Sequence, residues 1–511
     1  MSAPLLSGLA PAHLVAAPVL LPLFAGVLLL LAGRLEPLPR RILGLSSSLA
    51  QVALALALLV ATASGDILVY ALGDWPAPFG IVLVADRLAA WMLLVTALVA
   101  LFALFHASRG DDLEGRHFHV LFQLQLFGLN GAFLTGDLFN LFVFFEILLL
   151  ASYGLLLHGG GPERTRAGLH FVVINLTGST LFLFAVGALY GVLGTLNMAD
   201  LAVKTAAAPA ENLGVVRAAG LLLFAVFALK AALLPLYLWL PAAYASASPA
   251  VAALFAIMTK VGAYGLLRVY TLIFGAGAGG AAGLIDAWLL PLALATLALG
   301  ALGALASRQL RHQVAYFVVA SIGSLLTAFG LGSASGIAAG LYYLPHTTFA
   351  AAAFFLLAEA IARRRGTLAD RLDPGPELIG SAGLGALFFV AAILVAGLPP
   401  LSGFLGKFMT LRAAVDHPAL PWVMGIVLSA GLLSMVALAR SGSLLFFRAQ
   451  GRIEGATAPA TLAELAPILA LLGLCVTLTL WAGPASEFAR ATADQLLAPH
   501  GYVHAVLGQG G

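Results

Sequence analysis

Charged side chains are scarce in this sequence. Asp, Glu, Lys and Arg make up 9% of its 511 residues, whereas a soluble globular chain carries about 25%. Hydrophobic residues make up 62%, and the mean hydropathy is +1.04. A water-soluble fold is therefore excluded, and the chain is expected to be an all-α protein of the lipid bilayer.

Cysteine is almost absent, and no long basic tract occurs. The one cysteine, Cys475, can form neither an internal disulfide nor a thiolate metal cluster, and we interpret it as packing. The net charge of +3 is spread between hydrophobic blocks, so no nucleic-acid binding surface is predicted. The first apolar block has no basic residue before it, because the first one in the chain is Arg34. It therefore lacks the basic start of a signal peptide and should remain as the first span.

Motifs for cofactors are also missing. Gly275, Gly277 and Gly280 have the G-x-G-x-x-G spacing of a dinucleotide site. They lie in a loop between apolar blocks, without the strand that must precede such a site, so we interpret the match as chance. No metal-ligand cluster, nucleophilic triad or phosphate-binding loop is visible, and no cofactor is predicted.

Apolar blocks long enough to cross a bilayer, about twenty residues each, occur throughout the chain. We predict fourteen transmembrane helices from them. They lie near residues 14–33, 42–64, 82–106, 118–135, 137–158, 168–193, 217–240, 249–274, 286–306, 312–331, 334–361, 378–415, 420–447 and 462–482.

The distribution of Lys and Arg predicts the orientation, because these residues concentrate in cytoplasmic loops. Loops after odd-numbered spans hold fifteen of the 25: Arg34, Arg40, Arg41, Arg109, Arg116, Arg164, Arg166, Arg308, Arg311, Arg363, Arg364, Arg365, Arg371, Arg448 and Arg452. The other loops and the tail hold four: Lys204, Arg217, Arg412 and Arg490. Both termini are therefore expected outside the cytoplasm of a bacterial inner membrane.

Two spans are interrupted, the seventh by Pro235 and Pro241 and the twelfth by Pro399 and Pro400. Proline removes a backbone donor and breaks a helix, and such breaks mark ion paths in transporters built from inverted repeats. Breaks five spans apart predict two inverted five-helix repeats, helices 4–8 in residues 118–274 and helices 9–13 in residues 284–447. Residues 1–117 then hold helices 1–3, and residues 448–511 hold helix 14 and the tail.

Ionisable residues lie inside the predicted spans: Glu146 in the fifth, Lys230 in the seventh, Lys260 in the eighth and Lys407 after the break in the twelfth. Buried lysine and glutamate change protonation state when an opposite charge approaches or leaves, so such a row can relay protons. The alternative is that Glu146 and Lys230 form a buried ion pair that only fixes helix packing, which leaves the other two lysines unexplained.

Histidines and hydroxyl groups can extend this row. His346 either continues the relay, since histidine titrates between about pH 5 and 8, or is a hydrogen-bonded core residue. His312 and Asp137, at span starts, are candidates for gating or proton entry. Polar side chains of the sixth and tenth spans serve either as water-binding walls or as contacts between helices: Asn175, Thr177, Ser179, Thr180, Ser321, Ser324 and Thr327.

Other basic residues lie near the ends of spans. Arg87, Arg268 and Arg440 are expected to extend their charged groups toward the membrane surface.

The residues around these positions resemble a known family. The segments are the one around Glu146, FALKAALLPLYLWLPAAYASASP, ALFAIMTKVGAYGLLRVY and GLPPLSGFLGKF. They are similar to the antiporter-like membrane subunits of Mrp-type cation/proton antiporters, respiratory complex I and membrane-bound hydrogenases. Within this family, WPAPFGIVLVADRLAA and LYYLPHTTFAAAAFFLLAE resemble the D-type subunit of Mrp antiporters.

The resemblance implies a function and a set of site residues. It implies fourteen helices with two inverted repeats, a coupled pair Glu146 and Lys230, and a polar axis continued by Lys260, His346 and Lys407. It also implies a complex with a longer antiporter-like subunit and small hydrophobic subunits, in which protons drive the export of Na⁺ or K⁺. The alternatives are a proton-pumping subunit of complex I or a hydrogenase, and a scaffold that transports nothing.

Overall fold

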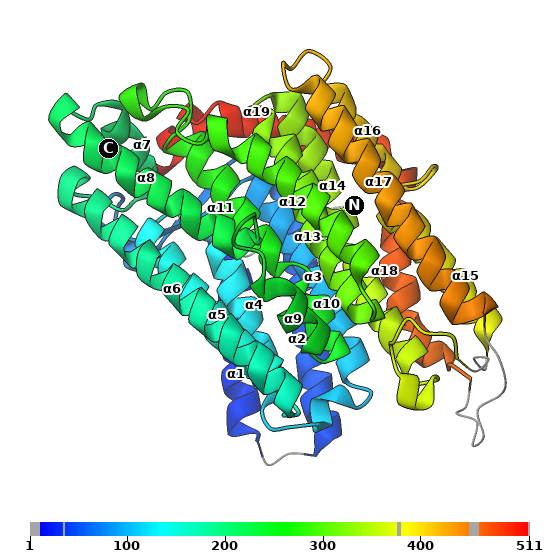
Figure 1. The fold of residues 1–511 in the computed structure, drawn as a ribbon. Coiled ribbons are helices and arrows are strands. Elements are labelled where there is room, and N and C mark those ends of the chain that lie inside the picture. The colour runs from blue at the N-terminus through cyan, green and yellow to red at the C-terminus, as the bar shows by residue number, and fades with distance from the viewer. Residues whose placement is uncertain (1–10, 34–35, 376–379, 449–458, 509–511) are drawn as a thin grey trace.

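The computed structural model describes residues 11–33, 36–375, 380–448 and 459–508, and nearly all of its regular structure is helical (Figure 1). Arg34 and Arg452, two of the arginines that predict the orientation, lie outside the described residues. The first six helices are α1 (Pro11–Leu31), α2 (Pro37–Thr62), α3 (Arg87–Ala107), α4 (Phe118–Leu134), α5 (Leu138–Leu156) and α6 (Pro162–Leu193).

In the middle of the chain two spans are each divided into two helices. The helices of this region are α7 (Met198–Ala206), α8 (Ala210–Ala231), α9 (Trp239–Ser246), α10 (Pro249–Phe255) and α11 (Met258–Leu272). The remaining helices are α12 (Asp286–Ala306), α13 (Leu310–Gly330), α14 (Ala334–Ala362), α15 (Ser381–Ala396), α16 (Ser402–Ala413), α17 (Leu420–Gly442), α18 (Leu462–Leu480), α19 (Ala482–Leu497) and α20 (His500–Leu507).

The predicted class and the predicted spans agree with the structure. Among the described residues, twelve helical segments are long and apolar enough to cross a bilayer, and Phe118–Leu134 and Ser381–Ala396 are shorter apolar helices. Together they coincide with the fourteen predicted spans. The repeat boundaries that we derived from the two breaks stay a prediction.

The seventh and twelfth spans are broken as predicted, but the prolines contribute differently. The chain leaves α8 at Ala232, which has φ +59°, and Pro235 lies in the gap before α9. The freed N–H of Leu234 donates to the hydroxyl of Thr296, 2.9 Å away. Pro241, in contrast, lies in the first turn of α9, where a missing N–H leaves no helical bond unmade. It therefore does not break the helix.

The second break lies between α15 and α16 and contains both Pro399 and Pro400. The eighth span, which we expected to be continuous, is also interrupted, because α10 ends at Phe255 and α11 begins at Met258. The sequence of this third break contains no proline or glycine, so its composition did not reveal it.

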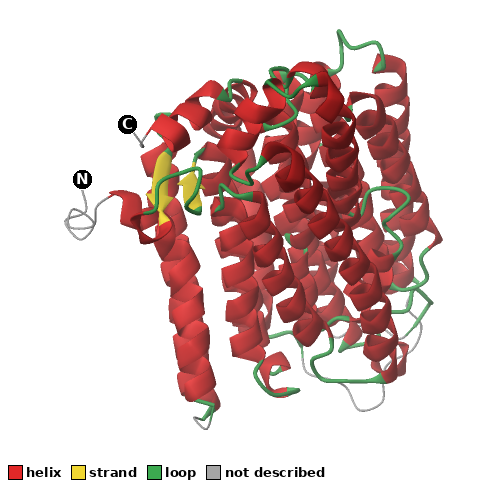
Figure 2. Ribbon diagram, turned by 90° about the vertical axis from the view of Figure 1, so that its left-hand side faces the viewer, coloured by secondary structure: helices red, strands yellow, loops and turns green. Residues whose placement is uncertain are grey.

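The two ends of the bundle differ. Strands β1 (Leu68–Ala71) and β2 (Val82–Ala85) form an antiparallel hairpin at one end (Figure 2), against α1 and α20. We call this end the hairpin face. The opposite end, the arginine-rich face, carries arginines in loops and at helix ends: Arg109, Arg164, Arg311, Arg363 and Arg371. Their contacts join neighbouring segments of this face. Neither the hairpin nor the helices α7, α19 and α20 follow from the apolar blocks of the sequence.

Candidate functional site

Lys230 lies in the last turn of α8, directly before the first break. The residue is 7% exposed. The ammonium nitrogen is 3.4 Å from the Oδ1 atom of Asn175 in α6 and 3.5 Å from the carbonyl oxygen of the same residue. Of the polar residues predicted on the sixth span, Asn175 therefore faces the site, whereas the hydroxyls of Thr177 and Thr180 are exposed and bond to their own helix.

Glu146 lies near the middle of α5, as predicted, and is partly buried. The structure does not place it in contact with Lys230. Among the described residues, Glu146 forms no ion pair within 4.0 Å, and its Oε1 atom is buried without a hydrogen-bond partner. The alternative of a buried ion pair that locks the packing is therefore wrong for this conformation.

Lys260 is fully buried near the start of α11, two residues after the helix begins. Its ammonium nitrogen has no hydrogen-bond partner in the described part of the chain, and neither does the hydroxyl of Thr259. Gly262, two residues further on, lies against the backbone of α8. A Cβ atom there would be 2.7 Å from the carbonyl carbon of Lys230, so only glycine lets the two lysine-bearing helices approach this closely.

His346 is buried in α14, directly after Pro345. Its Nδ1 atom is hydrogen bonded to the hydroxyl of Ser402, the first residue of α16, at 2.9 Å. A Cβ atom on Gly403 would be 2.8 Å from the Nε2 atom of the imidazole. The small residues in the GLPPLSGFLGKF segment therefore bring the second broken helix onto the imidazole.

Lys407 lies one turn further along α16 and reaches back across the break. Its ammonium donates a hydrogen bond of 2.8 Å to the carbonyl oxygen of Ala396, the last residue of α15. Helix C-termini carry partial negative charge from unpaired carbonyl groups. The ammonium of Lys407 is therefore stabilised by the end of the half-helix before the break.

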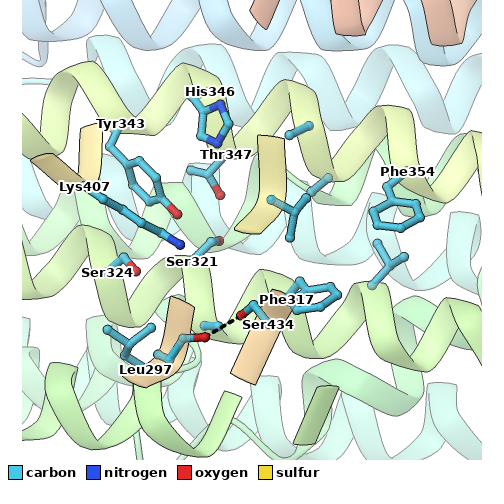
Figure 3. Close-up of a pocket in the computed structure, with 16 residues that line it drawn as sticks. Leu297, Phe317, Ser321, Ser324, Tyr343, His346, Thr347, Phe354, Lys407 and Ser434 are labelled. Carbon is cyan, nitrogen blue, oxygen red and sulfur yellow. Dashed lines mark hydrogen bonds between the residues drawn. The ribbon is translucent and has the colours of Figure 1, made fainter. Parts of the chain in front are cut away.

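A cavity adjoins both His346 and Lys407 (Figure 3). In Figure 3 the Lys407 side chain extends toward Tyr343, Ser321 and Ser324. The cavity has a volume of about 30 Å³, which is room for about two waters. Two of the predicted hydroxyl residues of the tenth span thus line the site, whereas Thr327 bonds to its own helix.

The two entry candidates lie at opposite ends of the bundle. His312, in the first turn of α13, lies between two surface pockets of about 480 and 630 Å³ at the arginine-rich face. Asp137 precedes α5 at the hairpin face and accepts a hydrogen bond of 2.8 Å from the backbone N–H of Asn140. Burial raises the pKa of Asp137 above its ordinary value.

A buried ionic pair that the sequence did not indicate joins Arg268 to Asp86. Arg268, which we expected to extend toward the membrane surface, is only 3% exposed and donates two hydrogen bonds to Asp86, at 2.6 and 2.7 Å. Asp86 also caps α3 through the N–H of Ala89. The two partners are 182 positions apart, so no local signal could have paired them.

The three lysines and His346 are placed where they can bind and release protons. Three amine side chains and one imidazole lie in or beside interrupted helices. Lys230, His346 and Lys407 bond to an amide, to carbonyl groups and to a hydroxyl, all neutral, and Lys260 has no partner among the described residues. No group of three His, Cys, Asp or Glu side chains in the described ranges could hold a metal ion. Groups of this kind bind and release protons without a cofactor.

The sequence is similar to a known family of membrane subunits and to two curated bacterial proteins. The family model described as NADH:quinone oxidoreductase/Mrp antiporter, transmembrane, matches residues 135–434. The chain is 43% identical over 520 residues to the D-type subunit of a probable K⁺/H⁺ antiporter from Rhizobium meliloti, covering 95% of this chain and 96% of that protein. It is 37% identical over 498 residues to the D-type subunit of a Na⁺/H⁺ antiporter from Alkalihalophilus pseudofirmus, covering 97% and 99%.

Two solved structures of membrane complexes contain chains with the same fold. A chain of the Mrp complex from Dietzia sp. DQ12-45-1b superposes with a TM-score of 0.86 at 29% identity, covering 97% of this chain and 99% of that one. A chain of respiratory complex I from Thermus thermophilus superposes with a TM-score of 0.78 at 27% identity, covering 94% and 99%.

Proposed function

Because this chain belongs to the NADH:quinone oxidoreductase/Mrp antiporter family of membrane subunits, as its motifs predicted, we propose that it is the proton-conducting D-type subunit of a multisubunit Na⁺ or K⁺/H⁺ antiporter. Protons pass along Glu146, Lys230, Lys260, His346 and Lys407. In this proposal the chain carries out no redox chemistry.

The observation that carries the proposal is the burial of three lysines at breaks in the helices. A lysine at the centre of a membrane helix costs about 2.5 to 3.5 kcal/mol on insertion scales. Three of them therefore cost roughly 8 to 10 kcal/mol, comparable to the whole stability of a typical domain, about 5 to 15 kcal/mol. Structural packing alone gives no reason to keep them, whereas proton transfer requires them.

The contacts of the lysines suit proton transfer. Lys230 is held by two contacts of 3.4 and 3.5 Å, which are longer than the usual 2.9 to 3.0 Å. Little stability is lost when its side chain turns toward Glu146. Lys407 and His346 share a cavity with room for about two waters, which can carry a proton between them.

The membrane supplies the driving force. A proton that crosses 100 mV releases about 2.3 kcal/mol, which the complex uses to export the cation. The positive-inside rule places the arginine-rich face in the cytoplasm and both termini outside it. The bacterial relatives favour the plasma membrane as the location.

The partners follow from the same family membership. Both named relatives are subunits of antiporters, and the Dietzia structure is that of a complex. We expect this chain to assemble with a longer antiporter-like subunit and with small hydrophobic subunits.

Substitution of the first two relay residues tests the proposal. In everted vesicles that contain the whole complex, Glu146→Gln and Lys230→Ala should lower cation-dependent proton flux by at least about 100-fold, the typical effect of losing a proton-transfer group. Lys204→Ala is the matched control, because that lysine lies on the surface helix α7 and pairs with Asp200. Normal flux in either assembled relay variant would refute the relay.

A second experiment separates the antiporter from its relatives. The tagged chain is purified from its native membrane in mild detergent, and all copurifying proteins are identified by mass spectrometry. Hydrophobic antiporter subunits without redox proteins support the assignment. Flavin or iron–sulfur subunits in stoichiometric amounts would instead make the chain part of a redox-driven pump.

A further inference from the structure

Asp111 is a buried carboxylate that the proton relay does not use. It lies in the short 3₁₀ helix Asp111–Leu113 between α3 and α4, at the arginine-rich face, and is 2% exposed. Among the described residues its side chain has two hydrogen-bonding contacts, at 3.4 Å to the guanidinium of Arg363 and at 3.5 Å to the backbone N–H of Ala250. Both exceed the usual hydrogen-bond length of 2.9 to 3.0 Å.

The next residue in the chain provides a direct comparison. Asp112 accepts two hydrogen bonds from Arg41, at 2.7 and 2.8 Å, and contacts the imidazole of His119 at 3.1 Å. Arg363, in contrast, directs its shortest bond, 2.7 Å, to Glu359 and not to Asp111. Of two adjacent buried carboxylates, Asp112 is therefore fully compensated and Asp111 is not.

The difference in contacts predicts a difference in protonation. Burial raises the pKa of Asp111 to about 6, although the charge of Arg363 lowers it. Burial also acts to raise the pKa of Asp112, but hydrogen bonds from His119 and Arg41 lower it to about 2. The charged and titratable groups around Asp111 are Glu359 from α14, Arg363 directly after that helix, Glu114 from the same loop as Asp111, and His158 after α5. His158 is hydrogen bonded to the Asp111 backbone.

The contact with Ala250 connects Asp111 to the segment that leads to Lys260. Ala250 is the second residue of α10, and the chain continues through the interruption into α11. Along this segment the hydroxyls of Ser248 and Thr259 and the amine of Lys260 are buried and have no hydrogen-bond partner among the described residues. Buried polar groups are nearly always paired, with protein or with water, so these three atoms mark positions for water.

We propose that Asp111 exchanges protons between the solvent at the arginine-rich face and Lys260, through waters along α10 and the start of α11. In the inward direction the ammonium of Lys260 gives up one proton and becomes neutral, the carboxylate of Asp111 accepts that proton through water, and the carboxylic acid then releases it to the solvent. The proposal rests on the proposed function of Lys260 as a proton carrier.

The test compares adjacent carboxylates in the whole complex, in everted vesicles. Asp111→Asn keeps the shape and an acceptor for Ala250 but cannot carry a proton, and should lower cation-dependent proton flux by about tenfold or more. Asp111→Glu should restore most of the flux. Asp112→Asn is the matched control and should stay within about twofold of the unmodified complex, since this residue lies outside the proposed path.

Chemical rescue separates proton transfer from a structural role. Asp111→Ala leaves a space beside Ala250, and added formate, a small proton carrier, should raise its flux, whereas formamide should not. Glu146→Gln is measured in the same membranes. If it abolishes flux while Asp111→Asn does not, the inference about Asp111 fails alone; if it has no effect, the relay itself fails. Failure of both Asp111→Asn and Asp111→Ala to assemble, or rescue by formamide as well, would assign Asp111 to folding and overturn the proposal.

Discussion

Substitution of Gly397 by alanine tests whether the bond between Lys407 and the end of α15 matters for transport. Gly397 directly follows α15 and has φ +75°. A Cβ atom at this position would be 2.7 Å from the Cδ atom and 2.9 Å from the ammonium nitrogen of Lys407. The lysine must therefore move away, and its bond to the carbonyl oxygen of Ala396, now 2.8 Å, must lengthen or break.

The expected loss of proton flux follows from the strength of the hydrogen bond between Lys407 and Ala396. A hydrogen bond to a charged group contributes about 1.5 to 3 kcal/mol, and each 1.36 kcal/mol changes a rate about tenfold. Gly397→Ala should therefore lower cation-dependent proton flux by about 10- to 100-fold. The left-handed backbone adds a separate loss of stability of about 1 to 2 kcal/mol.

Two other glycines serve as controls that separate these effects. Gly332 has φ +64° but no neighbour within 4 Å of an added Cβ atom, and Gly383, in the first turn of α15, has neither a positive φ nor a neighbour. Gly332→Ala should therefore lose stability without losing flux, and Gly383→Ala should lose neither. Flux is measured in everted vesicles by dequenching of a pH-sensitive dye after addition of Na⁺ or K⁺, normalised to assembled complex. Unchanged flux in assembled Gly397→Ala would refute the reasoning.

Three further predictions concern buried charges. Asp86→Ala leaves Arg268 buried and uncompensated and should destabilise the complex by about 3 to 5 kcal/mol. The double variant Asp86→Ala with Arg268→Met should recover most of that loss. Thermal unfolding followed by size-exclusion chromatography measures both variants, and a double variant as unstable as the single one contradicts the expectation. Lys260→Met removes a buried amine without a hydrogen-bond partner among the described residues. It should raise the unfolding temperature and abolish cation-dependent proton flux. A lower unfolding temperature would contradict this, because it would mean that the amine is stabilised by hydrogen bonds or water. The pKa of Asp111 rises from 3.8 to about 6 on folding, so the unfolded chain ionises first as pH increases. The free energy of unfolding therefore falls by about 3 kcal/mol between these pH values. Asp111→Asn should stabilise the complex above pH 6 and not below pH 4, and equal stabilisation at both pH values would contradict the pKa shift.

The spans and the positions of the ionisable residues could be read from the sequence, because both depend on short segments. About twenty apolar residues must cross the bilayer wherever they occur, and a lysine inside such a segment is buried whatever surrounds it. The two proline-containing breaks were predictable for the same reason. The break between α10 and α11 was not, because neither Ala256 nor Ile257 is incompatible with a helix.

The amino-acid sequence by itself thus determined that this is a membrane protein of fourteen spans with Glu146, Lys230, Lys260, His346 and Lys407 inside them. Only the tertiary structure decided what each charge contacts. Arg268 meets Asp86 across 182 positions, and of two adjacent aspartates one is paired with an arginine at 2.7 Å and the other only at 3.4 Å. Such differences arise from distances between helices far apart in the chain, which are set by close packing at residues such as Gly262 and cannot be read from local composition.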